Sequence, residues 1–286
     1  MRVRHAIVTG DPAAVLARHQ DLLARPWQQR LGNIGFPVGI VALTIFSVWW
    51  LDISFAQIGP GLAELGKFIA LMIPPSTGGH LRLFLQAMVE TLAIAFLGTL
   101  IAAVLAIPLA LLAAENTSPS RVLRFAIRRV LDVIRGIDTL IWALVFVGVV
   151  GLGPFAGILA IAVSDTGGFG KLFSEAIEAT RGRERETIVA SGGTNWLGIR
   201  FGVLPQVLPI IAGQILYFFE SNTRSATIIG IVGAGGIGLQ LSEQIRTYDF
   251  DRVAFIVLMI LVAVATIDWI SGKLRFAIIG RRPIRN

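Results

Sequence analysis

The chain has 286 residues, of which 55% are hydrophobic and only 15% are charged. A soluble domain normally carries about 25% charged residues, so this composition leaves too little polar surface for a soluble fold of this size. The absence of cysteine excludes a disulfide-stapled secreted fold. The composition therefore predicts an all-α, polytopic membrane protein.

The first 33 residues are predicted to be a cytoplasmic tail, in which Asp11-Pro12 is suited to begin a short amphipathic helix. We do not expect a signal peptide, because no small-residue cleavage site follows the first apolar run. That run, Ile34–Leu51, is long enough to form the first transmembrane helix. Residues 52–87 are predicted to be extracytoplasmic and to contain an interfacial helix, whose apolar residues recur at helical spacing: Leu62, Leu65, Ile69 and Met72.

Four further apolar stretches follow at Met88–Ala114, Thr139–Ser164, Val203–Phe219 and Val253–Ile270. Thr139–Ser164 contains 26 uncharged residues, with Gly151-Leu152-Gly153-Pro154 in its middle. It can therefore be one kinked helix or two short helices joined by a tight turn.

The distribution of the basic residues decides between these alternatives. If Thr139–Ser164 crosses twice, four groups of five Lys and Arg residues share one side of the membrane, and the other five lie opposite. If it crosses the membrane once, the two sides carry 13 and 12 Lys and Arg residues. Because cytoplasmic loops carry an excess of Lys and Arg, we predict six transmembrane helices with both termini cytoplasmic. Residues 88–272 then form the transmembrane core, and residues 273–286 form a cytoplasmic tail.

The net charge of +7 lies in short clusters between apolar runs, which is typical of membrane topology rather than of nucleic-acid binding. The run Gly233–Gly238 satisfies G-x-G-x-x-G, but the acidic residue that a dinucleotide site needs about 20 positions later is absent. We expect a bend and close helix packing there instead. The chain has no P-loop motif and no clustered histidines, so we expect no cofactor, no metal site and no enzymatic activity of its own.

The longest predicted cytoplasmic loop, residues 171–202, has its own helical pattern. A short helix ends at Gly192-Gly193, a second stretch follows, and Leu204-Pro205 begins a membrane span. This order predicts a protruding helical elbow, which is suited to receive force from a soluble partner. The alternative is an ordinary solvated loop.

The spacing of Glu186, Gly192 and Leu204-Pro205 resembles the EAA loop of ABC importer permeases. Thr187-Ile188 stand where Ala-Ala is usual in that motif, and Gly202 stands where Ile is usual. The resemblance implies that this loop couples the chain to an ATPase subunit. The residues implied to form the coupling loop are Glu186, Ala190, Gly192, Gly193, Thr194, Leu204 and Pro205.

Further segments are similar to phosphonate importer permeases. They are residues 139–146, 150–157, 170–178, 203–206 and, most closely, 217–228. The similarity covers most of Leu62–Ile279, although Asp138 replaces a proline that is usual in the family. The similarity implies a type I importer fold. It also implies that the chain lies among the lipids of a bacterial inner membrane and works as a homodimer. The implied partners are two ABC ATPase subunits, which hydrolyse ATP with Mg, and an extracytoplasmic binding protein. The implied substrate is a phosphonate, phosphite or a phosphate ester.

Ionisable residues inside membrane spans are functional hypotheses, because burying their charge is costly. Glu220 and Arg224 are four residues apart, so they can pair on a helix, or Arg224 can face an anion at the outer mouth of the pathway. Glu90 and Asp268 are further charged candidates, which we expect near the membrane interface. The residues predicted to line a translocation pathway are Glu220, Asn222, Arg224, Arg135 and Asp138.

Two other transporters fit parts of this pattern. A secondary transporter driven by an ion gradient needs a coupling-ion site of its own and often contains inverted repeats. The sequence shows no internal repeat and no carboxylate cluster in its central spans. Methionine importer permeases share the implied fold and the EAA loop. Phe219-Glu220, Asn222 and the outer amphipathic helix favour the phosphonate branch.

Overall fold

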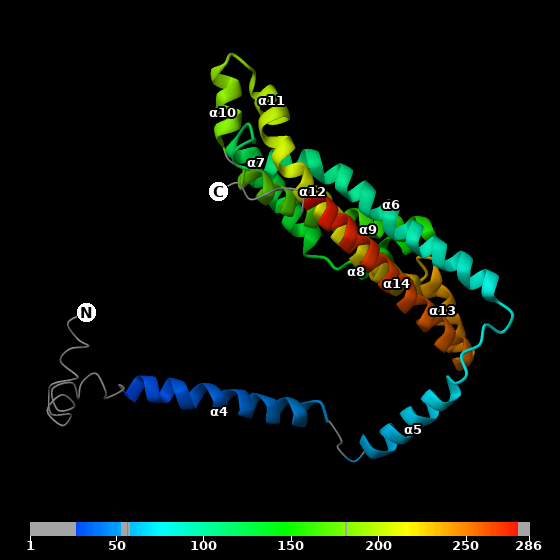
Figure 1. Cartoon of the computed structure of the whole chain (residues 1–286). Coiled ribbons are helices and arrows are strands. Elements are labelled where there is room, and N and C mark those ends of the chain that lie inside the picture. The colour runs from blue at the N-terminus through cyan, green and yellow to red at the C-terminus, as the bar shows by residue number, and fades with distance from the viewer. Residues whose placement is uncertain (1–26, 53–55, 57, 181, 280–286) are drawn as a thin grey trace, which may run out of the picture. The chain divides into compact units, whose positions relative to one another are not determined.

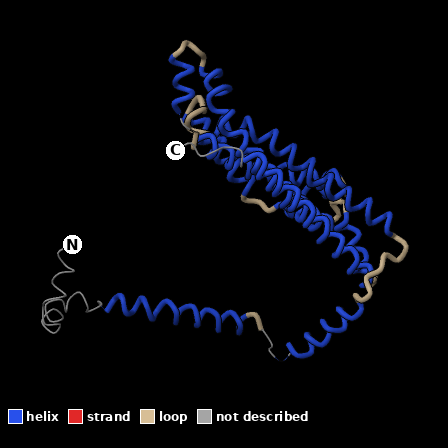
Figure 2. Tube along the Cα trace, in the orientation of Figure 1, coloured by secondary structure: helices blue, strands red, loops and turns tan. Residues whose placement is uncertain are grey.

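The computed structural model describes residues 27–52, 56, 58–180 and 182–279, and every regular element within these ranges is a helix (Figure 2). The chain divides into two compact units, residues 1–66 and 67–286. The prediction of an all-α fold is confirmed. The amphipathic helix predicted at Asp11-Pro12 lies outside the described residues.

The first unit contains α4 (Trp27–Trp50), which begins before the predicted start of the first span at Ile34. Its apolar side chains from Phe36 to Trp50 are largely exposed, as expected for a helix that meets lipid. The helix α5 (Ile58–Leu71) extends across the boundary between the units and contains no buried residue. A helix was predicted in this outer segment, and the structure confirms that it forms.

The second unit contains the long helices and the elbow, and Figure 1 labels them in chain order. The elements are α6 (Leu81–Ala113), α7 (Arg121–Arg135), α8 (Thr139–Val150), α9 (Pro154–Glu178), α10 (Gly182–Ala190), α11 (Asn195–Leu197), the π-helix η2 (Gly198–Val203), α12 (Leu204–Ile231), α13 (Ile237–Arg246) and α14 (Phe250–Ile279).

The number of membrane-crossing helices differs from the predicted six when only length and apolar composition are considered. Among the described residues, three stretches qualify: Leu81–Ala113, Asn195–Ile231 and Phe250–Ile278. The pair α7 and α8, bent by 85°, can count as a fourth. Three predicted crossings do not meet this criterion. The apolar part of α4, Gly35–Trp50, is too short. α8 has only 12 residues, and α9 carries polar residues and glycines along its length.

The predicted break in Thr139–Ser164 is present, and the two-helix alternative is the correct one. α8 ends at Val150, and α9 begins at Pro154. The intervening Gly151 and Gly153 have φ values of 91° and 134°, which residues other than glycine rarely adopt.

Several helices continue past the ends of their apolar runs. α9 extends to Glu178, so residues 171–178 are helical and do not belong to the predicted coupling loop, 171–202. Gly167 and Gly170, just before this stretch, do not end the helix, and both pack against α7. A Cβ atom on Gly167 would lie 2.7 Å from the backbone nitrogen of Arg135. Likewise, α14 includes residues 273–279 of the predicted tail.

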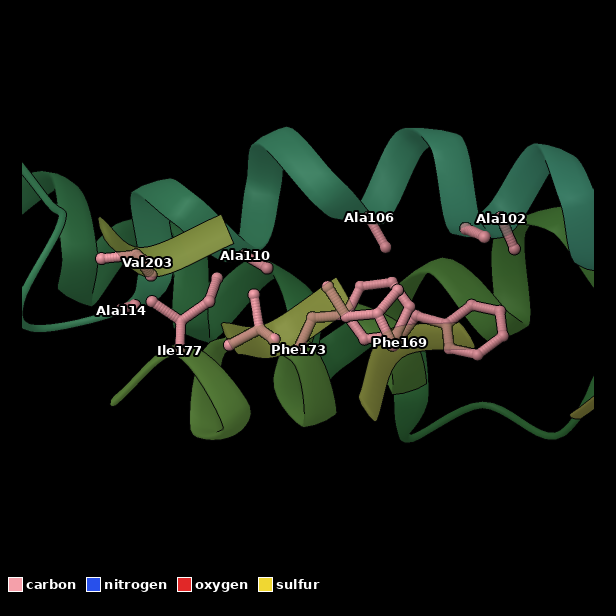
Figure 3. Close-up of a cluster of buried hydrophobic side chains, with 11 residues drawn as sticks. Ala102, Ala106, Ala110, Ala114, Phe169, Phe173, Ile177 and Val203 are labelled. Atoms are coloured by element: carbon pink, nitrogen blue, oxygen red, sulfur yellow. The ribbon is translucent and has the colours of Figure 1, made fainter. Parts of the chain in front are cut away.

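The core of the second unit is built from small residues on α6 and large ones on α9 (Figure 3). Ala102, Ala106 and Ala110 are fully or almost fully buried against Phe169 and Phe173. The two phenyl rings stack with their centroids 4.9 Å apart. Without a hydrophobic force between helices in lipid, small residues stabilise their association by allowing close approach.

The Gly233–Gly238 run forms the bend predicted for it. Gly233, Gly235 and Gly236 all have positive φ values, and α12 and α13 approach closely beside them. A Cβ atom on Gly238 would lie 1.9 Å from the carbonyl oxygen of Thr227. The first turn of α13 is anchored to α6, because Glu90 accepts a hydrogen bond of 2.9 Å from the backbone N–H of Gly236. This contact gives Glu90 a structural role.

Candidate functional site

Residues 182–203 form the predicted elbow, and they extend beyond the ends of the long helices (Figure 1). Its first leg, α10, ends in two characteristic hydrogen bonds. The N–H of Gly192 donates to the carbonyl of Val189, and the N–H of Gly193 donates to the carbonyl of Ile188, both at 3.0 Å. Gly192 has a φ of 88°. This is the Schellman arrangement, in which a glycine at the left-handed position reverses the chain.

The second leg begins at Thr194, whose side-chain oxygen accepts a hydrogen bond from the N–H of Leu197. The chain then continues through α11 and η2 into α12, which has Pro205 in its first turn. The elbow predicted from the sequence is confirmed, and its second leg is continuous with a membrane span.

The two legs pack tightly at a pair of glycines. A Cβ atom on Gly198 would lie 3.0 Å from Cγ of Arg185, and one on Gly202 would lie 2.9 Å from the backbone nitrogen of Arg185. An isoleucine at position 202 would therefore collide with α10. The departure of Gly202 from the EAA pattern has a steric reason in this chain.

The seven predicted coupling residues all lie in the elbow or the first turn of α12, and most of them are exposed. Their neighbours include a residue that the sequence analysis did not identify. The Trp196 side chain is 59% exposed at the start of the second leg. Exposed tryptophans are frequent anchors of protein interfaces. The signal in the sequence is a tryptophan that follows two polar residues, Thr194 and Asn195, in a predicted cytoplasmic loop.

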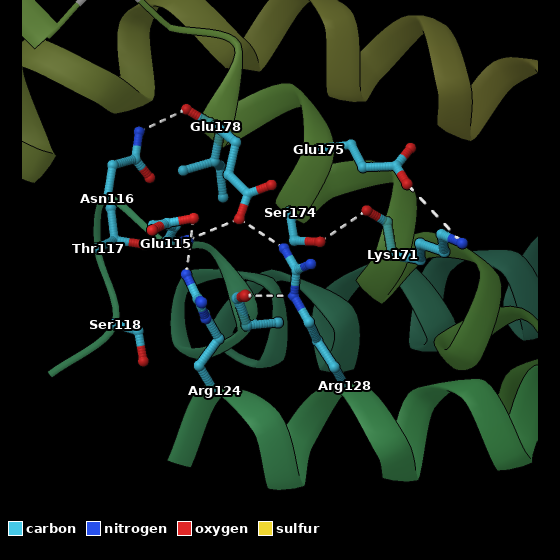
Figure 4. A network of polar contacts seen from close by, with 12 residues as sticks. Glu115, Asn116, Thr117, Ser118, Arg124, Arg128, Lys171, Ser174, Glu175 and Glu178 are labelled. Atoms are coloured by element: carbon cyan, nitrogen blue, oxygen red, sulfur yellow. Dashed lines mark hydrogen bonds and ion pairs between the residues drawn. The ribbon is translucent and has the colours of Figure 1, made fainter. Parts of the chain in front are cut away.

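A network of polar contacts ties the helix ends together at the base of the elbow (Figure 4). Glu178 at the end of α9 accepts a hydrogen bond of 2.7 Å from the N–H of Glu115 and one of 2.5 Å from Arg128 on α7. Glu115 also pairs with Arg124 at 2.8 Å. Asn116 donates to the carbonyl of Ile177 at 2.8 Å. The ends of α6, α7 and α9 are thus held as one junction.

Glu220 has two cationic neighbours. Its carboxylate is 2.8 Å from Nη2 of Arg275 on α14 and 3.7 Å from Nη2 of Arg224 on its own helix. The predicted pair with Arg224 exists, but Arg275 is the nearer partner. Only 9% of the Glu220 side chain is exposed, whereas half of the Arg224 side chain is. Sequence reasoning missed Arg275 because it assigned that residue to the tail.

Asn222 lies in a second polar group, which we call the mid-bundle cluster and which consists of Thr99, Asp165 and Asn222. The Asn222 amide donates to Asp165 at 2.5 Å and to Thr99 at 2.8 Å. All three residues are buried, with exposures of 2%, 7% and 5%. Asn222 therefore joins helices and does not line an open pathway within one chain.

Thr99 and Asp165 lie near the middle of α6 and α9. Arg224 follows Asn222 by two residues on α12, so it is close to this cluster along the helix. Its place at the outer mouth of the pathway stays a prediction. Asp165 was missed because small polar residues follow it and end the apolar run.

The remaining predicted pathway residues lie at the corner between α7 and α8. Asp138 caps α8, since its carboxylate accepts a hydrogen bond of 2.8 Å from the N–H of Leu140. Aspartate is a favoured residue at this position, which explains why it can replace a proline here. Arg135 is exposed and lies 3.9 Å from Asp132. Within one chain, the five predicted pathway residues occupy three separate places.

Comparison with known proteins gives a consistent assignment. Residues 106–278 match the family described as "Binding-protein-dependent transport system inner membrane component". HtxC of Stutzerimonas stutzeri, provisionally assigned as a phosphite transport system permease, is 38% identical over 85% of this chain and 87% of its own. PtxC of Stutzerimonas stutzeri, a phosphite transport system permease protein, is 35% identical over 87% of this chain and 90% of its own.

A solved structure of the same architecture is a chain of the MetNI methionine ABC transporter in an inward-facing conformation. It aligns with a TM-score of 0.61 and covers 70% of this chain and 97% of its own. The two sequences are 19% identical, so the likeness concerns the fold. The type I ABC importer permease fold expected from the sequence is confirmed.

Proposed function

The chain belongs to the family of binding-protein-dependent transport system inner membrane components, and we propose that it is the permease subunit of an ATP-driven importer for a small phosphorus oxyanion. The substrate class comprises phosphite, phosphonates and phosphate esters. The observation that carries this proposal is the similarity to PtxC, which is named for phosphite transport and is matched over 87% of this chain.

The elbow is the proposed docking site for an ABC ATPase subunit. Three features support this role: it extends beyond the membrane-spanning helices, it presents the exposed Trp196, and its second leg continues directly into α12. A displacement of the elbow would therefore be passed to a membrane span. The partner binds ATP together with Mg and hydrolyses the ATP, and this chain itself is proposed to bind no cofactor.

The complete transporter contains two copies of this chain, two ATPase subunits and an extracytoplasmic binding protein. The separation of Arg135 and Asp138 from Glu220 and Arg224 supports a pathway between two copies, because one copy does not bring these residues together. The distribution of basic residues supports a cytoplasmic location of both termini. The chain is then a multi-pass protein of a bacterial inner membrane.

One observation favours a second candidate, a transporter driven by an ion gradient. Asp165 is a buried carboxylate near the middle of α9, and buried carboxylates within membrane spans are used by secondary transporters to couple ions. Family membership supports the ATP-driven importer. The methionine transporter supports the fold alone, so a methionine substrate has less support than a phosphorus oxyanion.

Copurification followed by an ATPase assay tests the proposed function. A tag on this chain should recover an ABC ATPase subunit in equal number. Vanadate-sensitive hydrolysis by the complex should rise when its binding protein is loaded with phosphite or methylphosphonate, and methionine should have no effect. Stimulation by methionine alone, or recovery of a chain without any ATPase subunit, would contradict the proposal.

A further inference from the structure

The two legs of the elbow pack closely against each other. Gly198 and Gly202 of η2 leave room for Arg185 of α10, since a Cβ atom added at either glycine would lie about 3 Å from Arg185. Close packing resists relative movement, because moving one leg forces its neighbour to shift. We therefore expect a force applied near Gly192, at the tip of the elbow, to move both legs together.

Arg185 also reaches out of the elbow. Its Nη1 donates to the carbonyl oxygen of Asn116, in the connection between α6 and α7. Its Nη2 lies 3.4 Å from Oδ1 of Asn195 on the second leg. One planar guanidinium thus contacts both legs of the elbow and a segment 69 residues earlier in the chain.

The surroundings of this contact are open. A cleft of about 490 Å³ lies beside it, lined by residues of the elbow and of the helix ends, including Asn116, Thr180, Glu186 and Asn195. The elbow is therefore not packed continuously against the bundle at this place. Besides the covalent connection of the second leg to α12, a displacement can reach the helix ends where side chains bridge the cleft, and Arg185 is such a bridge.

Asn116 connects in turn to the junction at the base of the elbow. Its side chain donates to the carbonyl of Ile177 at 2.8 Å and lies 3.4 Å from the hydroxyl of Thr180. The preceding residue, Glu115, bonds Glu178 through its N–H. A shift of Asn116 would consequently move the ends of α6 and α9 together.

We propose that Arg185 is a positioning residue, which transmits displacement of the elbow to the α6–α7 connection and the end of α9. This inference rests on the proposed function, since it requires an ATPase subunit that moves the elbow. Arginine suits the role because its planar fork holds two acceptors in fixed directions, whereas lysine presents a single flexible ammonium group.

Three variants test the role of Arg185 in the complete complex reconstituted into proteoliposomes. Arg185→Ala removes the bridge, Arg185→Lys retains the charge, and Arg121→Ala is a control at an exposed arginine on α7, outside the elbow. Phosphite imported per ATP hydrolysed should fall by about tenfold or more in Arg185→Ala, as expected from losing a charge-assisted hydrogen bond. It should fall less in Arg185→Lys and stay at the parent value in Arg121→Ala.

Recovery of the ATPase subunit and basal hydrolysis should remain within about twofold of the parent in all three variants, because the bridge lies away from the tip of the elbow. An unchanged import ratio in Arg185→Ala would overturn the inference. Loss of the ATPase subunit from Arg185→Ala, with retention in Arg121→Ala, would also overturn it by placing Arg185 in the docking surface. The proposed function would survive both results.

Hydrogen exchange provides a readout that does not depend on the substrate. Adding a non-hydrolysable ATP analogue to the parent complex should change amide exchange in both the elbow and residues 114–120. In Arg185→Ala the change should be confined to the elbow. Equal changes at residues 114–120 in both proteins would contradict the inference. If the parent imported no phosphite, the proposed substrate would be wrong, and this comparison would still decide the role of Arg185.

Discussion

Asn222 on α12 donates a hydrogen bond of 2.5 Å to the carboxylate of Asp165 on α9, at the middle of the helix bundle. The direction of this bond follows from the third member of the cluster. The hydroxyl of Thr99 donates to the carbonyl of Ala95 at 2.7 Å, so its oxygen can only accept from Asn222. Both hydrogens of the amide are therefore donated, one to α6 and one to α9. The cluster fastens three helices at a depth where water is unavailable to replace a lost partner.

The acceptor at position 165 should matter more than its charge. Asp165→Leu leaves an amide hydrogen of Asn222 buried without a partner, which costs about 1–3 kcal/mol. Asp165→Asn can retain an acceptor oxygen and should cost less. Thermal unfolding of the purified permease in detergent measures both, and Thr99→Val provides a matched loss of the other acceptor. Equal stability of Asp165→Leu and the parent would contradict this role.

Arg275 should stabilise the fold more than Arg224 does, because it is the nearer partner of the buried Glu220. Arg275→Ala leaves the carboxylate with only a distant partner and should cost about 3 kcal/mol or more of unfolding free energy. Arg224→Ala removes a half-exposed group at 3.7 Å and should cost less than about 1 kcal/mol. Despite this small cost, Arg224→Ala should lower transport without changing the affinity of the binding protein for its ligand, because an anion that leaves water for the membrane pathway needs a compensating charge. Normal flux in that variant would end the pathway assignment of Arg224.

Gly192 and Gly202 should respond differently to substitution. Gly192 has a φ of 88° but open space around a Cβ atom, so its constraint lies in the backbone. Gly192→Asn should therefore transport better than Gly192→Leu, because asparagine tolerates the left-handed region. Gly202→Ala meets the backbone of Arg185 and should separate the legs of the elbow. Import per ATP measures both effects. Equal import by Gly192→Asn and Gly192→Leu would show that the backbone at the tip is not constrained.

The two ends of the bundle should lie on opposite sides of the membrane. Because the chain lacks cysteine, single cysteines report sidedness without background. In intact cells, a membrane-impermeant maleimide should label Gly79→Cys before α6 and leave Gly193→Cys in the elbow unlabelled. Permeabilised cells should show labelling of both. The reverse pattern in intact cells would invert the topology and remove the elbow from the side where ATP is hydrolysed.

The features that sequence reasoning located depend on local chemistry. Glycines 151, 153 and 192 mark positions of positive φ, and Pro154 and Pro205 begin helices, so the break between α8 and α9 and the elbow could be predicted. The ends of α9 and α14 were harder to predict, because both helices continue through polar residues after their apolar runs end. Asp165 and Arg275 lie beyond the ends of these apolar runs. Their partners are also 57 and 55 residues away, so neither pairing leaves a local pattern in the sequence.

Uptake of phosphite into proteoliposomes containing the complete complex tests the central claim most directly. With loaded binding protein outside and ATP available to the ATPase subunits, phosphite should accumulate inside. Vanadate should stop the uptake, and a protonophore should leave it unchanged. Uptake that persists with vanadate and disappears with the protonophore would contradict an ATP-driven importer and would instead support an ion-coupled transporter using Asp165.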